Sequence, residues 1–191
     1  LVGSEMCIRD SIYSWGGGTS GTLGSSVLSN QSSPRILTGS PTYTNIYQNY
    51  LTCWGIDYLG GLYGWGVNTS YQVGDGTVTQ RNLPTIVASG LNFVQVFPGA
   101  YLQAAPYDTN VMALTQSGTL YGWGANSNRV ISNAAVTYVS TPTIISGGKP
   151  FVQMQSFFST LGGSSWYGLT DDGTLYACLL YTSPSPRDVE E

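Results

Sequence analysis

Residues 113–126 read Ala-Leu-Thr-Gln-Ser-Gly-Thr-Leu-Tyr-Gly-Trp-Gly-Ala-Asn. Two short apolar runs flank a Ser-Gly pair, and this pattern predicts a β-hairpin whose tight turn contains Gly118. The pattern returns as Gly-Leu-Thr-Asp-Asp-Gly-Thr-Leu-Tyr at residues 168–176, with Gly173 in the turn, and in a more divergent form at residues 55–63. Such self-similarity indicates a chain built from tandem copies of one small unit.

The repeat continues forward from three Trp-Gly pairs, and the copies stay in register without a gap well beyond each pair. A proline follows each tryptophan at the same interval in all three copies, then an isoleucine, and further on an aromatic residue. Chance does not explain this alignment, so we interpret these positions as the structural framework of each copy. They include Trp15, Gly16, Pro34, Trp65, Gly66, Pro84, Trp123, Gly124 and Pro142.

The copies differ in length at one place. The interval from Trp65 to Trp123 is longer than the interval from Trp15 to Trp65, and the extra residues lie between the end of the aligned block and the next hairpin pattern. A framework that keeps its register while one segment varies indicates a loop at that segment. The sequence therefore predicts loops at residues 97–110 and 155–165.

The composition favours an all-β fold. The chain has 191 residues, of which 41% are hydrophobic and 13% aromatic, and it is rich in Gly, Ser, Thr, Tyr and Val. These residue types favour strands and turns over helices. Four short strands in each copy would form one antiparallel sheet, the unit of a propeller blade. The sequence has no apolar run long enough to be a candidate transmembrane helix.

These motifs resemble the repeat of the regulator of chromosome condensation family. Residues 113–126 are similar to its signature, residues 72–76 resemble its Gln-Leu-Gly-x-Gly stretch, and Pro84 matches the proline that follows. The resemblance covers about residues 11–177 and implies a β-propeller, typically with seven blades. Three copies cannot close such a ring. The expected fold is therefore all-β, a partial, open β-propeller of about three four-stranded antiparallel blades, in which a fourth copy is truncated.

The sequence also departs from the family pattern. The usual histidine before the Ala-Leu pair is absent from every copy, and residues 128–132 replace the Gln-Leu-Gly stretch in the third copy. The loops, rich in Thr, Ser and Asn and poor in charge, are closer in style to repeats of bacterial, phage or environmental proteins. We interpret the chain as a fragment of a longer propeller, because three copies cannot close a ring, and as metagenomic, because of its two ends.

The two ends differ in composition from the repeat region, residues 11–177. Residues 1–10 and 178–188 resemble translated sequencing-adapter DNA, and the tail as a whole is residues 178–191. In the first segment Glu5 precedes Arg9 and no apolar stretch follows, which argues against a signal peptide. We expect both ends to be foreign to the fold, which leaves one native cysteine and no indication of the compartment.

Catalytic and metal-binding chemistry is poorly supported. The chain has no histidine, which excludes a Ser-His-Asp triad, a Cys-His pair and a histidine-ligated metal. Residues 16–21 fit the pattern G-x-G-x-x-G, but they lie in a β repeat and are read as an interstrand loop. Asp171 and Asp172 are read as a turn. The predicted protein is not an enzyme and has no catalytic, cofactor-binding or metal-binding residues.

The sequence favours a protein-interaction scaffold that binds its partner through loops on one face. The formal net charge of −4 argues against a nucleic-acid partner, and no membrane partner is indicated. Alternatives are a guanine-nucleotide exchange or chromatin-binding propeller and a carbohydrate-binding or virion-attachment propeller; a glycan-active enzyme ranks below these. The predicted partner-binding residues are the loop aromatics, which could equally fold the loops onto their own blades. They are Phe97, Tyr101, Tyr107, Phe157 and Phe158.

Overall fold

The computed structural model describes residues 12–37, 41–99, 109–127, 129–132, 135–146, 150–159 and 163–178. Within these ranges the chain forms strands and turns, and it contains no helix that could cross a membrane. The terminal segments that the sequence assigns to foreign DNA lie outside the described residues, apart from Cys178 at the end of the last strand.

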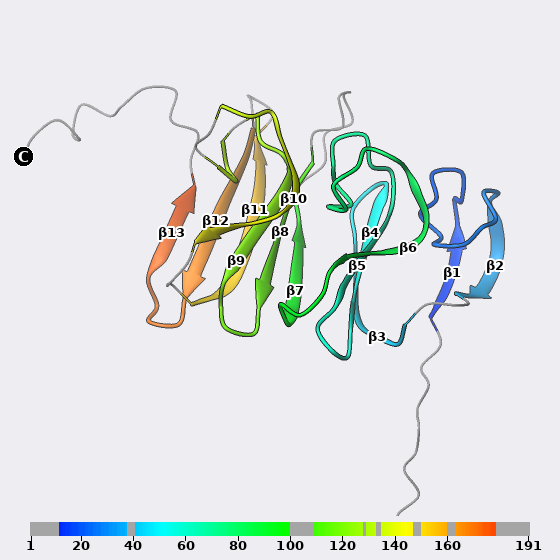
Figure 1. Cartoon of the computed structure of the whole chain (residues 1–191), viewed down its shortest axis with the longest axis horizontal. Coiled ribbons are helices and arrows are strands. Elements are labelled where there is room, and N and C mark those ends of the chain that lie inside the picture. The colour runs from blue at the N-terminus through cyan, green and yellow to red at the C-terminus, as the bar shows by residue number, and fades with distance from the viewer. Residues whose placement is uncertain are drawn as a thin grey trace, which may run out of the picture.

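The strands follow one another in four groups along the chain (Figure 1). They are β1 (Tyr13–Gly16), β2 (Gln31–Ile36), β3 (Tyr43–Gln48), β4 (Thr52–Asp57), β5 (Leu62–Gly66), β6 (Arg81–Ala88), β7 (Phe93–Pro98), β8 (Asn110–Thr115), β9 (Leu120–Ala125), β10 (Tyr138–Ser146), β11 (Phe151–Ser159), β12 (Gly163–Thr170) and β13 (Leu175–Cys178).

The strands form a row of antiparallel sheets, as the sequence predicts (Figure 1). In the described ranges two sheets have four strands, β3-β4-β5-β6 and β7-β8-β9-β10, the first sheet has β1-β2, and the last has β11-β12-β13. Trp65 and Trp123 of the Trp-Gly pairs each lie in the third strand of a four-stranded sheet. A sequence copy therefore begins in one blade and ends in the next, and the row contains two complete blades and a partial blade at each end.

The hairpin predicted from the Ser-Gly and Asp-Gly pairs is present in three sheets. The two strands of the hairpin pair with one register, in which Ile56 faces Leu62, Leu114 faces Leu120 and Leu169 faces Leu175. In the last hairpin the carboxylate of Asp172 accepts hydrogen bonds from the Thr170 hydroxyl at 2.6 Å and from the Thr174 amide at 2.9 Å. The acidic pair therefore belongs to a turn, as predicted.

The repeated prolines lie in the last strands of their sheets, which are the outer edges. Pro34 is in β2, Pro84 in β6 and Pro142 in β10. Proline has no amide hydrogen to donate to a ladder, so it is tolerated on an edge strand or near an irregularity. The pairing of β6 with β5 is irregular between Gly64 and Gly66, beside Pro84, which agrees with this rule.

Apolar side chains fill the space between neighbouring sheets. One cluster joins Ile56 and Leu62 of the second sheet to Phe93 and Trp123 of the third. A second cluster joins the third sheet to Phe151, Met154 and Trp166 of the fourth. Burial of each large apolar side chain contributes about 1.5–3 kcal/mol, so contacts between sheets carry much of the stability.

The connections lie on two edges of the row, here called the loop rim and the turn rim, and every connection of more than six residues lies on the loop rim. Because the strands alternate in direction, the links after every first and third strand lie on one edge, which is the loop rim (Figure 1). It carries the connections at 17–30, 49–51, 67–80, 99–109, 126–137 and 160–162. The turn rim carries connections of four to six residues at 37–42, 58–61, 89–92, 116–119, 147–150 and 171–174.

The predicted loop at residues 155–165 is largely a hairpin. β11 runs to Ser159 and β12 starts at Gly163, with Phe157 facing Ser165 and Phe158 facing Ser164. The added residues extend two paired strands, because aromatic and hydroxyl side chains favour extended structure and their backbone groups pair across the hairpin. In the predicted loop at 97–110, the two ends lie in β7 and β8, and residues 100–108 lie outside the described residues.

Cys53 offers a test of the packing between the first two sheets. It is buried beside Tyr43 and Trp65, its thiol donates to the carbonyl of Thr22 at 3.4 Å, and burial raises its pKa to about 12. Because the thiolate is the reactive form, alkylation of Cys53 at pH 8 should be more than about 100-fold slower in the folded protein than in urea. Mass spectrometry of the Cys53 peptide measures both rates; equal rates would contradict the burial.

Candidate functional site

Three of the five partner-binding residues expected from the sequence lie in strands β7 and β11, which both end at the loop rim. Phe97 is partly buried at the end of β7 and packs against the cluster between the third and fourth sheets. Phe157 and Phe158 lie in β11 by their backbone, and the Ser156 hydroxyl donates to the carbonyl of Pro98 at 3.5 Å. The end of β7 and the middle of β11 are therefore adjacent. Tyr101 and Tyr107 lie outside the described residues.

Asn68 organises the loop that follows the third strand of the second sheet. Its side chain is fully buried. The amide nitrogen donates to the carbonyls of Thr77 at 2.8 Å and Thr79 at 3.2 Å, and the amide oxygen accepts from the backbone amide of Val73 at 2.9 Å. One side chain thus joins three parts of a long connection, which would otherwise leave buried backbone groups unpaired.

Asn126 has the same role in the third sheet. Its amide nitrogen donates to the carbonyls of Ser132 and Val136, and its oxygen accepts from the backbone amide of Ile131 at 3.0 Å. Sequence reasoning did not assign a role to either asparagine. The signal is present, because both stand at the same position after the repeated tryptophan, whereas the first copy has Gly18 there.

An ion pair joins the loop at 67–80, which contains Asn68, to the next strand, β6. Arg81 of β6 pairs with the nearly buried carboxylate of Asp75, which also accepts hydrogen bonds from Asn68 and Thr77. Burial works to raise the pKa of Asp75, but the bonds from Arg81, Thr77 and Asn68 outweigh it and hold the pKa below its usual value. The ionised form is thus the one that the folded loop stabilises.

This ion pair predicts a pH dependence of stability. A folded-state pKa below the unfolded value stabilises the protein above the unfolded pKa, about 3.9, and the contribution is lost as the pH falls through the folded pKa. The unfolding free energy of the unmodified chain should exceed that of Asp75→Asn at pH 6, and the gap should shrink as the pH falls to 3. Urea denaturation at each pH measures it; a gap that stays constant would exclude the linkage.

The repeated tryptophans bind the loop of the preceding sheet. The indole nitrogen of Trp65 donates to the carbonyl of Thr22 at 3.0 Å, and that of Trp123 donates to the carbonyl of Gln72 at 2.8 Å. A Cβ atom at Gly74 would lie 2.7 Å from the Trp123 indole nitrogen, so only glycine fits under the ring. The framework tryptophans therefore connect blades. Trp15 is 59% exposed and lacks such a loop within the described residues.

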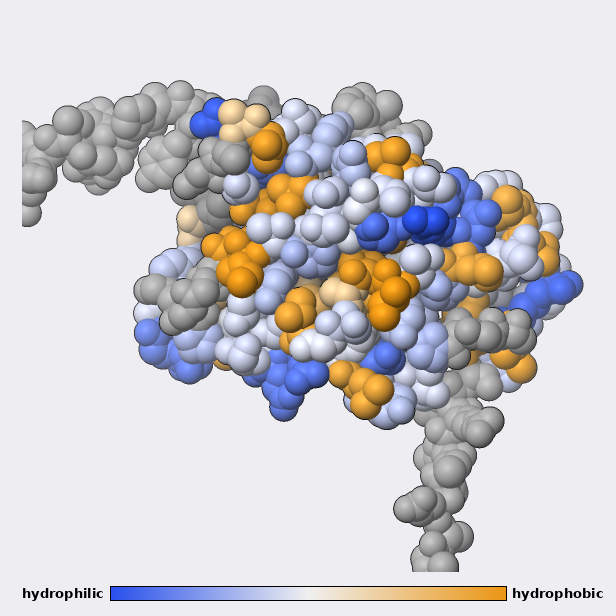
Figure 2. All heavy atoms as spheres, in the orientation of Figure 1, coloured by the Kyte–Doolittle hydropathy of each residue, from blue (hydrophilic) through white to orange (hydrophobic). Residues whose placement is uncertain are grey.

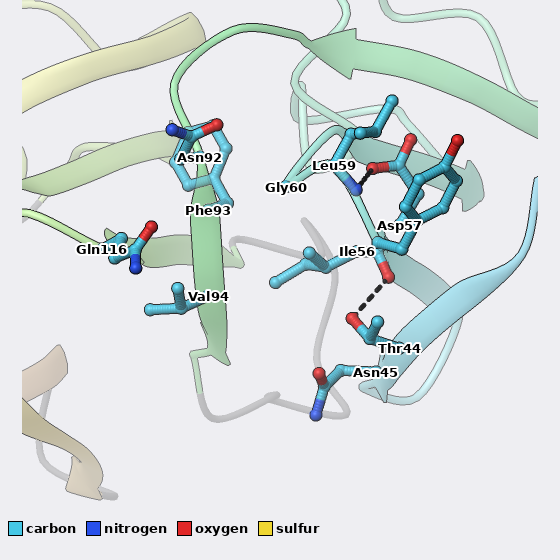
Figure 3. Close-up of a pocket in the computed structure, with 11 residues that line it drawn as sticks. Thr44, Asn45, Ile56, Asp57, Leu59, Gly60, Asn92, Phe93, Val94 and Gln116 are labelled. Atoms are coloured by element: carbon cyan, nitrogen blue, oxygen red, sulfur yellow. Dashed lines mark hydrogen bonds between the residues drawn. The ribbon is translucent and has the colours of Figure 1, made fainter.

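The turn rim contains a cleft between the two complete sheets, shown in Figure 3. Its volume is about 480 Å³, within the range typical of small-molecule sites. One wall is the turn at Tyr58 and Leu59 with the start of β3, and the other is Asn92, Val94 and Gln116. No residue of the cleft was expected from the sequence, because the cleft forms only where two sheets meet.

The surface does not single out one apolar site. Figure 2 shows the face of the molecule seen in Figure 1, on which apolar residues form separate clusters with polar residues between them. Exposed large side chains occur in several sheets, among them Tyr58 and Leu59 on the turn rim. In the described part of the chain, no group of three or more His, Cys, Asp or Glu side chains is placed to hold a metal ion. The loop rim and the cleft are therefore the two candidate surfaces.

Comparisons with known proteins agree with the fold and the repeat. Residues 60–105 match the family model of the Regulator of chromosome condensation (RCC1) repeat. The described part of this segment, residues 60–99, starts at the turn rim and runs through β5, β6 and β7, so the match spans the junction between the two complete sheets. None of the curated proteins matches the chain in sequence.

Several solved structures share the fold. Human WBSCR16 is 22% identical over 88% of this chain, with a TM-score of 0.70. Prp20p from Saccharomyces cerevisiae, described with its binding properties to Gsp1p and histones, is 18% identical over 87% of the chain, with a TM-score of 0.67. Yeast RCC1 (Prp20) bound by Kap60 is 18% identical over 87%, with a TM-score of 0.65. The chain spans 42%, 40% and 39% of these three proteins.

Proposed function

We propose that this chain, in which residues 60–105 carry a regulator of chromosome condensation repeat, is part of a non-enzymatic scaffold that binds a protein partner through the loop rim. The observation that carries the proposal is that every connection of more than six residues lies on one edge of the sheets, which also carries the short connections at 49–51 and 160–162, while the other edge carries connections of four to six residues. Variable loops on a rigid framework are a common arrangement for binding surfaces.

The chemistry of the described loop rim supports binding more than catalysis. The loop at 67–80 uses its buried polar groups internally, in the network of Asn68, Asp75 and Arg81, which fixes its backbone in place. A loop that is already ordered loses little conformational entropy when a partner binds. The solved neighbours offer a parallel at the level of fold, since Prp20p is described with Gsp1p and histones and in complex with Kap60.

Two exposed tyrosines on opposite rims allow a matched experiment. Tyr50 lies on the loop rim, between β3 and β4, and is 59% exposed, whereas Tyr58 lies on the turn rim and is 69% exposed. A photo-crosslinking amino acid at position 50 should capture the partner from a lysate of the source organism, and the same amino acid at position 58 should not. Capture at position 58 alone, or at neither position, would refute the proposal.

The sparse charge predicts how the captured complex responds to salt. Few charged residues are available for steering, so affinity should arise from apolar contacts and backbone hydrogen bonds. The dissociation constant of the purified complex should change by less than about threefold between 50 and 500 mM NaCl. A loss of about 100-fold or more would indicate an electrostatic interface.

A further inference from the structure

The cleft on the turn rim has a lining that differs from the rest of the surface. Three amide side chains, Asn45, Asn92 and Gln116, face it from both sheets (Figure 3). Among the described residues, none hydrogen-bonds to these three side-chain amides. Each amide carries donors and an acceptor, so the cleft presents several unused hydrogen-bonding groups of both kinds.

Among the described residues that line the cleft, one side chain is charged, and its carboxylate is buried. This acidic residue, Asp57, is buried, and its carboxylate accepts hydrogen bonds from the backbone amides of Leu59 at 2.9 Å and Gly61 at 2.8 Å. Apolar area is available beside the amides, since Tyr58, Leu59 and Val94 are 69%, 66% and 47% exposed. A ligand that fits these walls is neutral, rich in hydroxyl or amide groups, and apolar on one face.

The edge strands that border the cleft are poorly suited to adding a peptide strand. The pairing of β3 with β4 is irregular at Thr44, and that of β7 with β8 is irregular at Val94. At the irregularity in β3, the Thr44 hydroxyl donates to the carbonyl of Ile56 at 3.1 Å. At the irregularity in β7, the carbonyl of Val94 accepts a hydrogen bond from the Tyr47 hydroxyl. Bulges of this kind bend an edge strand and interrupt its ladder, which opposes strand addition.

The equivalent position between the third and fourth sheets serves as an internal comparison. There Gln116 and Ser117 replace Tyr58 and Leu59, Pro150 replaces Asn92, and Asp171 replaces Gln116. The framework contact is the same, because the amide of Phe151 donates to Gly118 as that of Phe93 donates to Gly60. The exposed side chain of Tyr58 and the amides of Asn92 and Gln116 therefore occur in the cleft between the second and third sheets but not at the equivalent position of the next pair of sheets. The fold does not require them.

We propose that the cleft between the second and third sheets binds a neutral oligosaccharide of two or three sugar units. The amides of Asn45, Asn92 and Gln116 bond to sugar hydroxyls, and Tyr58 with Leu59 contacts the apolar face of a ring. Amide groups combined with an aromatic side chain suit a ligand that has many hydroxyls and no charge. This site is separate from the loop rim, so it stands or falls independently of the protein-binding proposal.

The test titrates the whole chain with maltotriose, cellotriose, xylotriose, mannotriose and chitotriose, each to 5 mM, by calorimetry and saturation-transfer NMR. At least one trisaccharide should bind, and Gln116→Ala and Asn45→Ala should each weaken that binding at least fivefold. Asp171→Ala changes the position equivalent to Gln116 in the next sheet and should leave binding unchanged. Circular dichroism confirms that each variant is folded.

Other outcomes overturn the proposal. They are the failure of all five sugars to bind, equal binding by the Gln116→Ala and unmodified chains, or tighter binding of a charged hyaluronan tetrasaccharide. A peptide with the sequence of residues 80–89, which is the edge strand β6 with one flanking residue at each end, is titrated as the probe for a protein partner. Binding of this peptide in the cleft, in place of any sugar, would assign the cleft to a protein partner.

Discussion

Replacement of Trp123 by alanine should lower the free energy of unfolding by about 3–5 kcal/mol. The side chain is fully buried in the cluster between the second and third sheets, and its indole nitrogen donates to the carbonyl of Gln72. The substitution leaves a cavity against Gly74, whose lack of a side chain admits the ring, and it removes the shorter of the two indole hydrogen bonds to the carbonyl of Gln72, the longer one coming from Trp54 at 3.2 Å. The second and third sheets therefore lose both apolar contact and the hydrogen bond from Trp123 to Gln72.

The matched control is Trp15→Ala. Trp15 stands at the same position of the repeat but is 59% exposed, so the change should cost less than about 1 kcal/mol. Urea denaturation followed by circular dichroism measures both variants, and Trp123→Phe, which keeps most of the volume, covers the case in which alanine prevents folding. Equal losses for positions 15 and 123 would mean that the repeated tryptophan stabilises its own sheet and not the junction.

The contrast between these two tryptophans shows what a repeat can predict. Periodicity identifies Trp15, Trp65 and Trp123 as equivalent, and the sheets confirm that each lies in the strand that precedes a long loop-rim connection. Burial is a different property, because it depends on whether a loop of the preceding sheet covers the ring. Trp65 and Trp123 have that loop, and Trp15 has none among the described residues.

The same distinction explains why the repeat pattern does not identify two other buried tryptophans. Trp54 and Trp166 are both fully buried between sheets, and the indole nitrogen of Trp166 donates to the side chain of Asn110 at 3.0 Å. They occupy different positions of their sheets, since Trp54 faces Gly64 and Trp166 faces Cys178. Each fills a space that other residues fill in the neighbouring copy, so no periodic signal marks them. Packing between particular sheets is a property of pairs of copies.

The candidate sites were predicted to different degrees. Most of the loop predicted at 97–110 lies outside the described residues, between the end of β7 and the start of β8, and most of 155–165 is paired strand. The partner-binding role of Phe97, Tyr101, Tyr107, Phe157 and Phe158 stays a prediction. The cleft on the turn rim had no signal in the sequence, because its walls come from residues that are far apart in the chain and meet only where two sheets pack.

The junction between blades can be tested most directly at a glycine. Gly118→Ala should destabilise the fold by about 2–4 kcal/mol, because a backbone cost and a packing cost add. The residue has φ of +78°, a conformation that costs an alanine about 1 kcal/mol. A Cβ atom there would also lie 2.6 Å from the Cα of Pro150 at the entry to the fourth sheet, and the backbone would have to move to relieve the overlap.

Gly173 separates the two costs. It occupies the same turn position in the last hairpin and has φ of +82°, but a Cβ atom there meets nothing within 4 Å among the described residues. Gly173→Ala should therefore cost only the backbone strain, about 1 kcal/mol, and the difference between the two variants measures the contact between the third and fourth sheets. Denaturation midpoints give both values under one set of conditions. If the two alanine variants lose the same stability, the turn of one blade does not press against the first strand of the next, and the packing of neighbouring sheets described above is wrong at this junction.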